Sequence, residues 1–342
     1  MCRSRVSTPL PDCERCVNSP GFVAVQVVPL YRTQVYGGKS WESRWYGQRR
    51  MSASNRRPSR RVVMGGAVVL LGLLIAVAMG LGREASTPSV AINHGRGKND
   101  LVVSIGLTGG FAPQAAVFSA VPTLVVSGDG RLITPGAQTA QFPGLLLAPL
   151  FERTITEAAI QKVLNLADAS RLLQRPPVYV AELNVADAPN TVVVLSANGQ
   201  TYTHSAYALG FDTPAQTPAR QTLADFVAAI SDVGKYFGAA NLGDETRFVA
   251  EQYRVQARVI SAEEIAAIDP RPTTVAWPAA AGVSLASAGQ CVIVQAADVQ
   301  TVFATATQIT VFTDDGVNYQ LAAAAMLPGD TCGTEELSAP TT

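Results

Sequence analysis

The chain has 342 residues, of which 48% are hydrophobic and 15% are charged. Its formal net charge is zero because the opposite net charges of its two parts cancel. Residues 1–61 hold 12 Lys and Arg against 3 Asp and Glu, whereas residues 62–342 hold 14 against 23. The acidic second part excludes the extended basic surface with which proteins bind nucleic acid or anionic lipid headgroups.

Residues 62–82 form an apolar run that contains no charged side chain. As a helix, this run of 21 residues is roughly 31 Å long, which is enough to cross a bilayer. Four arginines precede it, Arg56, Arg57, Arg60 and Arg61, and this asymmetry keeps the N-terminus in the cytoplasm. We therefore expect a single-pass protein of the cell membrane whose C-terminal part lies outside.

Two features of the N-terminal part leave alternatives open. A signal peptide cleaved at the weak small-residue sites near Ala78 would instead release a secreted protein. No cysteine follows the run closely, which excludes a lipoprotein. Met51 begins an ordinary basic n-region, so we expect translation to start there and residues 1–50, with Cys13 and Cys16, to be an upstream extension. The alternative for residues 1–50 is a disordered cytoplasmic tail.

The folded part begins after a predicted tether. Residues 83–100 are small and polar, which indicates a flexible segment in which His94 is solvated. Residues 101–107 are apolar and β-branched and predict a strand, and residues 121–133 predict a hairpin around a Ser-Gly-Asp-Gly turn. Turn chemistry explains Asp129, because a calcium loop needs several further oxygen ligands at fixed spacing.

Two amphipathic helices are marked by their caps. The first is predicted after the N-cap Thr156, with Glu157 favourably placed in its first turn. The second is predicted after the N-cap Thr217, with Pro218 at its first position. The residues that recur at helical spacing, and are expected to be buried, are Ile160, Val163, Leu164 and Ala167 in the first helix and Leu223, Phe226, Val227 and Ile230 in the second.

The clearest hairpin is predicted around the Asn-Gly dipeptide at 198–199, because this dipeptide supplies the positive φ angles of a type I′ turn. Such a loop pairs Leu195 with Tyr202 and Val193 with His204. His204 then lies on a mostly apolar face, and we expect a half-buried, hydrogen-bonded histidine; a catalytic or ligand-binding role is the alternative.

The C-terminal part continues the α+β pattern and contains the last two cysteines. Strands are predicted at 253–260 and 291–294, and a hairpin around residues 314–316. A single cysteine pair in an exported domain predicts a disulfide between Cys291 and Cys332, which closes a loop of roughly 40 residues and contributes about 4 kcal/mol. Two buried free thiols are the alternative.

Together these elements predict an α+β fold in which antiparallel hairpins are packed by helices in strand–strand–helix units, preceded by one transmembrane or signal-anchor helix. The expected organisation is an extension or tail at 1–50, a basic n-region at 51–61, the membrane helix at 62–82, the tether at 83–100, an α+β domain at 101–240, a smaller disulfide-closed α+β subdomain at 245–337 and a tail at 338–342.

The sequence offers little catalytic chemistry. It contains two histidines, and it lacks the GxSxG, HExxH, P-loop and GxGxxG patterns. A carboxylate pair of the kind used in glycoside hydrolysis would have to assemble in the fold. The acidic residues available for it are Glu152, Glu182, Asp187 and Asp212. We therefore assign no catalytic, cofactor-binding or metal-binding residue and expect no cofactor.

The order of features resembles a family of exported actinobacterial proteins for which no activity is established. The motifs that carry the resemblance lie at residues 128–131, 155–157, 185–189, 207–210 and 327–332. The resemblance implies export and an α+β architecture and implies no mechanism.

These observations favour a non-enzymatic envelope module that binds a partner, either another envelope protein or a small ligand. The membrane contact would be made through residues 62–82, and nucleic acid is not an expected partner. Two alternatives are an extracytoplasmic hydrolase that uses a carboxylate pair, and a carrier of a small apolar ligand enclosed between sheet and helices.

Overall fold

The computed structural model describes residues 91–179, 185–211 and 216–332. All described residues belong to one compact unit of the chain. Within these three ranges no helix is long and apolar enough to cross a membrane. The predicted membrane helix at 62–82, the segments before it and the tail at 338–342 lie outside the described residues.

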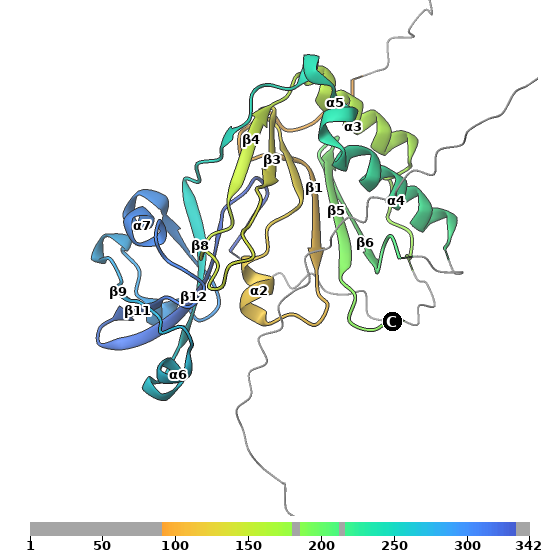
Figure 1. The fold of residues 1–342 in the computed structure, drawn as a ribbon. Coiled ribbons are helices and arrows are strands. Elements are labelled where there is room, and N and C mark those ends of the chain that lie inside the picture. Colours follow the sequence, from red (N-terminus) through yellow and green to blue (C-terminus); the bar gives the residue numbers. More distant parts are fainter. Residues whose placement is uncertain (1–90, 180–184, 212–215, 333–342) are drawn as a thin grey trace, which may run out of the picture. The chain divides into compact units, whose positions relative to one another are not determined.

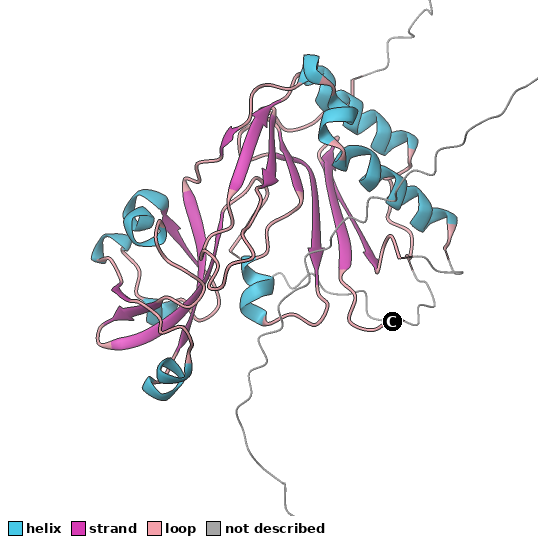
Figure 2. Ribbon diagram, viewed as in Figure 1, coloured by secondary structure: helices cyan, strands magenta, loops and turns pink. Residues whose placement is uncertain are grey.

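The described part is an α+β fold with two mainly antiparallel sheets, as the sequence predicts (Figures 1 and 2). The first sheet has seven strands in the order β6-β5-β1-β2-β3-β4-β7, and the Asn-Gly hairpin forms its β6 edge with the predicted pairing of Leu195 with Tyr202. Its strands are β1 (Leu101–Thr108), β2 (Leu124–Ser127), β3 (Arg131–Pro135), β4 (Leu150–Thr154), β5 (Asn190–Ala197), β6 (Gln200–Tyr207) and β7 (Thr246–Arg247).

Two helices pack side by side on one face of this sheet, α3 (Glu157–Ala169) and α4 (Pro218–Ser231) (Figure 1). Both N-caps are confirmed: the hydroxyl of Thr156 accepts a hydrogen bond from the amide of Ala159, and that of Thr217 from the amide of Arg220. The predicted buried faces are also confirmed, except that Val227 is only half-buried. Apolar periodicity and capping therefore suffice to define both helices.

The predicted strand–strand–helix units are only partly regular. β4 follows β3 before α3 begins, and β1 lies between β2 and β5, so it separates the two hairpins within one sheet. The segment between α4 and β7 contains α5 (Val233–Phe237) and η1 (Ala239–Asn241), and it is held on the sheet by hydrogen bonds such as Gly243 N–H to Thr154 O, 2.8 Å.

The second sheet has five strands in the order β10-β8-β12-β11-β9 and one parallel pair, β9 with β11. A capping box between Ser261 and Glu264 begins the short helix α6. The elements are β8 (Gln252–Val259), α6 (Ala262–Ala267), β9 (Thr274–Ala276), η2 (Ala279–Ala281), η3 (Leu285–Ser287), β10 (Val292–Gln295), α7 (Ala296–Phe303), β11 (Val311–Asp314) and β12 (Val317–Ala325).

The two sheets share a small apolar core. Leu327, just after β12, is buried against Val125, Ile133 and Leu150 on the face of the first sheet opposite to α3 and α4. The short helix α2 (Gln114–Ser119), which follows β1, lies against β12 at the same junction. The chain after the last strand therefore closes onto the first sheet.

Residues 91–100, the described end of the predicted tether, contact the folded part of the chain, which the sequence did not predict. The main chain of Ile92 exchanges two hydrogen bonds with the side-chain amide of Gln161, both 2.9 Å. His94 is 5% exposed, and its ring bonds the Gly95 carbonyl and the Glu157 carboxylate. The prediction of a solvated His94 was wrong, because this imidazole finds its partners on a helix that begins some 60 residues later.

Candidate functional site

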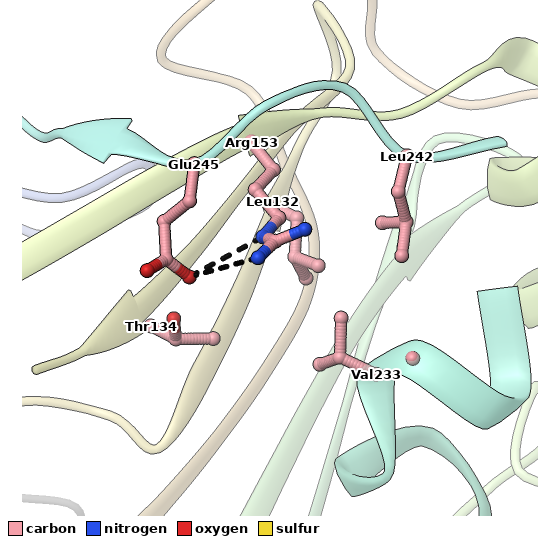
Figure 3. Close-up of a pocket in the computed structure, with 7 residues that line it drawn as sticks. Leu132, Thr134, Arg153, Val233, Leu242 and Glu245 are labelled. Atoms are coloured by element: carbon pink, nitrogen blue, oxygen red, sulfur yellow. Dashed lines mark hydrogen bonds and ion pairs between the residues drawn. The ribbon is translucent and has the colours of Figure 1, made fainter. Parts of the chain in front are cut away.

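The structure contains two hollows, and the smaller opens on the face of the first sheet that also carries α3 and α4. The smaller has a volume of about 190 Å³, and Figure 3 shows the Arg153 guanidinium reaching toward the Glu245 carboxylate at one side of it. Both Nε and Nη2 of Arg153 lie 3.3 Å from Oε2 of Glu245. Leu242 and Val233 form the apolar side. This volume is below the range of roughly 300–1,000 Å³ typical of small-molecule sites.

The larger hollow has a volume of about 440 Å³ and is open along one side. It lies where the loop before β4 meets β8 and α7. That loop is held to the turn after α7 by main-chain hydrogen bonds, among them Leu146 N–H to Ala306 O, 2.9 Å. The residues that line the hollow are Leu145, Leu147, Arg247, Tyr253, Gln300, Thr301, Phe303 and Ala304.

Strand register places the two hollows next to each other. Glu152 pairs with Thr246 and Phe151 with Arg247, so Arg153, Glu245 and Arg247 project to the same face of the sheet. Glu245 lines the first hollow and Arg247 the second, and two residues along a strand span about 7 Å. We refer to both hollows together as the β7 groove.

The β7 groove combines apolar surface with charge. Leu145 is 56% exposed, although it is a large apolar side chain. The rings of Tyr253 and Phe303 meet edge to face with centroids 5.4 Å apart and form the wall beneath α7. Burial raises the pKa of the Tyr253 phenol, and the nearby Arg247 guanidinium opposes this shift. Both Arg247 and Tyr253 line the larger hollow.

A second polar cluster, around His204, is closed to solvent. His204 is fully buried; Nε2 lies 2.8 Å from the Leu172 carbonyl, and Nδ1 lies 2.7 Å from the Tyr179 hydroxyl. The hydrogen bonding expected for His204 is confirmed, and its burial is deeper than predicted. Arg220, also fully buried, donates to the carbonyls of Tyr179, Tyr207 and Ala208. These hydrogen bonds hold the chain around β6 in place. Because both side chains are fully buried, a substrate cannot reach them.

Of the four candidate carboxylates, the two that the structure describes do not form a pair. Glu152 lies on β4, and Asp187 lies in the turn before β5, which is four strand spacings away, or about 19 Å. Carboxylates that cleave glycosides lie roughly 5–9.5 Å apart. Glu182 and Asp212 lie outside the described residues.

Asp129 has the role predicted from turn chemistry. Its carboxylate accepts hydrogen bonds from the Ser127 hydroxyl and from Nε of Arg131. Partial burial raises the pKa of Asp129, but these bonds outweigh it and the net shift is downward. In the ranges that the structure describes, no group of three or more His, Cys, Asp or Glu side chains is arranged to hold a metal ion.

The predicted disulfide is confirmed. Cys291, just before β10, and Cys332 are joined, with their Cα atoms 5.7 Å apart, a separation typical of disulfides. The bridge ties the segment that carries Leu327 to the edge of the second sheet. Sequence reasoning identified this pair but none of the residues of the β7 groove, because they come from segments as far apart as Leu145 and Ala304.

Comparison with known proteins assigns neither a family nor a function to this chain. No protein-family model, curated protein or solved structure matches this chain.

Proposed function

We propose that this protein is an extracytoplasmic, non-enzymatic binding module that receives an extended peptide segment of a partner protein in the β7 groove. Residues 62–82 would hold the module at the membrane, or would be removed to secrete it. The observation that carries the proposal is that the two hollows are lined by neighbouring residues of one edge, Glu245 and Arg247, with exposed Leu145 and Arg247 at the larger one.

The openness of the groove favours a segment of a macromolecule. A small ligand is usually buried over 70–90% of its surface, which a hollow open along one side does not provide. A peptide in extended conformation advances about 3.3 Å per residue, so three or four residues reach from one hollow to the other. Apolar side chains would then pack against Leu145 and Phe303.

The described residues offer less support to the alternatives. A hydrolase would need two carboxylates in one cleft, and Glu152 and Asp187 are about 19 Å apart. A carrier of an apolar ligand would need an enclosed cavity under α3 and α4. That interface is filled by side chains such as Val163, Leu164 and Phe226, each at most 1% exposed.

A selection experiment tests the proposal. A phage-displayed library of random dodecapeptides is selected on the full-length protein, kept in mild detergent because of its apolar run. The blocked variant is Ala304→Trp, which fills the larger hollow from an exposed position with ordinary helical backbone angles. Its matched control is Ala266→Trp, the same substitution at an exposed position of α6 that does not line the groove.

We expect enriched peptides that bind the wild type and the Ala266→Trp control equally and lose at least tenfold in affinity for Ala304→Trp. Failure to enrich any peptide, or equal binding to all three proteins, would contradict the proposal. Dimerisation of the wild type that Ala304→Trp abolishes would identify a second copy of the chain as the occupant and would contradict it too.

A further inference from the structure

Among the residues that the structure describes, the β7 groove contains one cation without a counter-charge. Its two arginines differ: Arg153 forms an ion pair with Glu245, whereas Arg247 has no carboxylate within 4.0 Å among the described residues. Arg247 is exposed, and its neighbours in the hollow are neutral side chains. The groove therefore carries a net positive charge, although the chain after residue 61 has 14 Lys and Arg against 23 Asp and Glu.

The surroundings of Arg247 indicate which kind of anion can bind there. A polyanion such as nucleic acid or an anionic membrane needs many cations on one surface, and the groove offers a single unpaired one, Arg247, among the described residues. A carboxylate matches one guanidinium, which binds both of its oxygens through parallel N–H groups. The phenol of Tyr253, on the wall of the same hollow, adds an O–H group that can donate a further hydrogen bond.

Apolar contacts continue on either side of this cation. Leu145 and Leu147 come from the loop before β4, and Phe303 comes from the end of α7. A ligand that satisfies the whole hollow thus needs one carboxylate with an apolar group beside it. In an extended peptide, this is an acidic residue flanked by a large apolar one.

We propose that the partner segment received in the β7 groove carries an Asp or Glu side chain bound by Arg247 next to an apolar side chain packed on Leu145 and Phe303. The proposal rests on the proposed function. It adds the chemical character of the partner segment and the residue that recognises it. Arg247 is a specificity-determining residue in this assignment.

The test is a double-mutant cycle with defined probes. The probes are C-terminally amidated peptides, each made in a matched pair with a central Glu or a central Gln between Leu and Phe; amidation excludes the terminal carboxylate as the source of charge. They are titrated against the full-length wild type, Arg247→Gln, Ala304→Trp and the control Arg271→Gln, which removes an exposed arginine outside the groove.

We expect the wild type and Arg271→Gln to bind the Glu peptide about tenfold more tightly than the Gln peptide, the size of a charge-assisted hydrogen bond. Arg247→Gln should not distinguish the two peptides. If the Glu preference persists in Arg247→Gln, or if the wild type shows none while Ala304→Trp still abolishes binding, the acidic partner is refuted and the binding groove stands. If neither peptide binds the wild type, or if Ala304→Trp binds both as the wild type does, both proposals fail.

Discussion

The Tyr179 hydroxyl lies 2.7 Å from Nδ1 of His204, and both side chains are buried under α4 and the loop that follows α3. A carbonyl can only accept a hydrogen bond, so Nε2 of His204 must carry the proton that it shares with the Leu172 carbonyl. Nδ1 is then unprotonated and accepts from Tyr179. The fold thus selects one neutral tautomer of His204.

This arrangement predicts a loss of stability in mild acid. Burial lowers the pKa of His204 from its ordinary value of 6.5, against the opposing effect of the Leu172 carbonyl. The unfolded chain therefore binds more protons below pH 6.5, and the stability contributed by neutral His204 is complete above that pH and lost as the pH falls toward the folded-state pKa. Urea midpoints between pH 7.5 and 5 should decline less for His204→Gln than for the wild type; parallel curves would exclude His204 as the source.

Arg220 is predicted to be the least replaceable side chain of this cluster. Arg220→Met removes the donors of the Tyr179, Tyr207 and Ala208 carbonyls and should lower the free energy of unfolding by about 3 kcal/mol. Arg220→Lys keeps the charge but cannot reach both segments with one ammonium group, so it should lose nearly as much. The measurement is chemical denaturation followed by circular dichroism. A lysine variant as stable as the wild type would show that charge, and not the fork of donors, is what matters.

Arg220 also illustrates what the sequence could and could not predict. The caps at Thr156 and Thr217, the Asn-Gly turn and the register of Leu195 with Tyr202 depend on residues close together in the chain, and all were predicted. The partners of Arg220 lie as many as 41 residues away, and no local pattern marks them.

The same reasoning applies to the sheet and to the candidate site. β1 lies between β2 and β5 because it pairs with both strands. The order of strands in a sheet depends on contacts between distant segments, and local strand propensity does not determine it. The β7 groove exists only because the loop around Leu145 meets α7, so Arg247 has no distinguishing signal in the sequence. The disulfide was accessible to prediction because counting cysteines after residue 82 leaves one pair.

The Arg254–Asp330 ion pair joins the second sheet to the segment after β12, and its loss should measurably lower the free energy of unfolding. Nη1 of Arg254 lies 3.2 Å from Oδ2 of Asp330, and the same guanidinium donates to Ala120 O and lies over the ring of Phe118. Burial raises the pKa of Asp330, with Arg254 opposing the shift.

Arg254→Gln should therefore lower the free energy of unfolding by about 2 kcal/mol, less than for a fully buried pair, because each partner keeps about a fifth of its side chain exposed. Arg258→Gln, which breaks the exposed pair with Glu264, is the control and should cost less than about 1 kcal/mol. Equal effects of the two substitutions in urea denaturation would contradict the special role of Arg254.

The disulfide should stabilise the fold by restricting the unfolded chain and by holding Leu327 in the core that the two sheets share. It closes a loop with a sequence separation of 41, for which the chain-entropy estimate is about 4 kcal/mol. Cys291→Ser with Cys332→Ser should lower the free energy of unfolding by up to this amount, and Leu327→Ala should then add little, because the segment is already loosened.

The matched control replaces Cys2, Cys13 and Cys16 with serine and should leave the unfolding curve unchanged. The intact mass without reductant should lie about 2 Da below that of the reduced chain in the wild type and in this control, since one bridge removes two hydrogens. Full additivity of the cysteine and Leu327 substitutions would mean that the bridge stabilises the second sheet alone, and that Leu327 reaches its buried position without it.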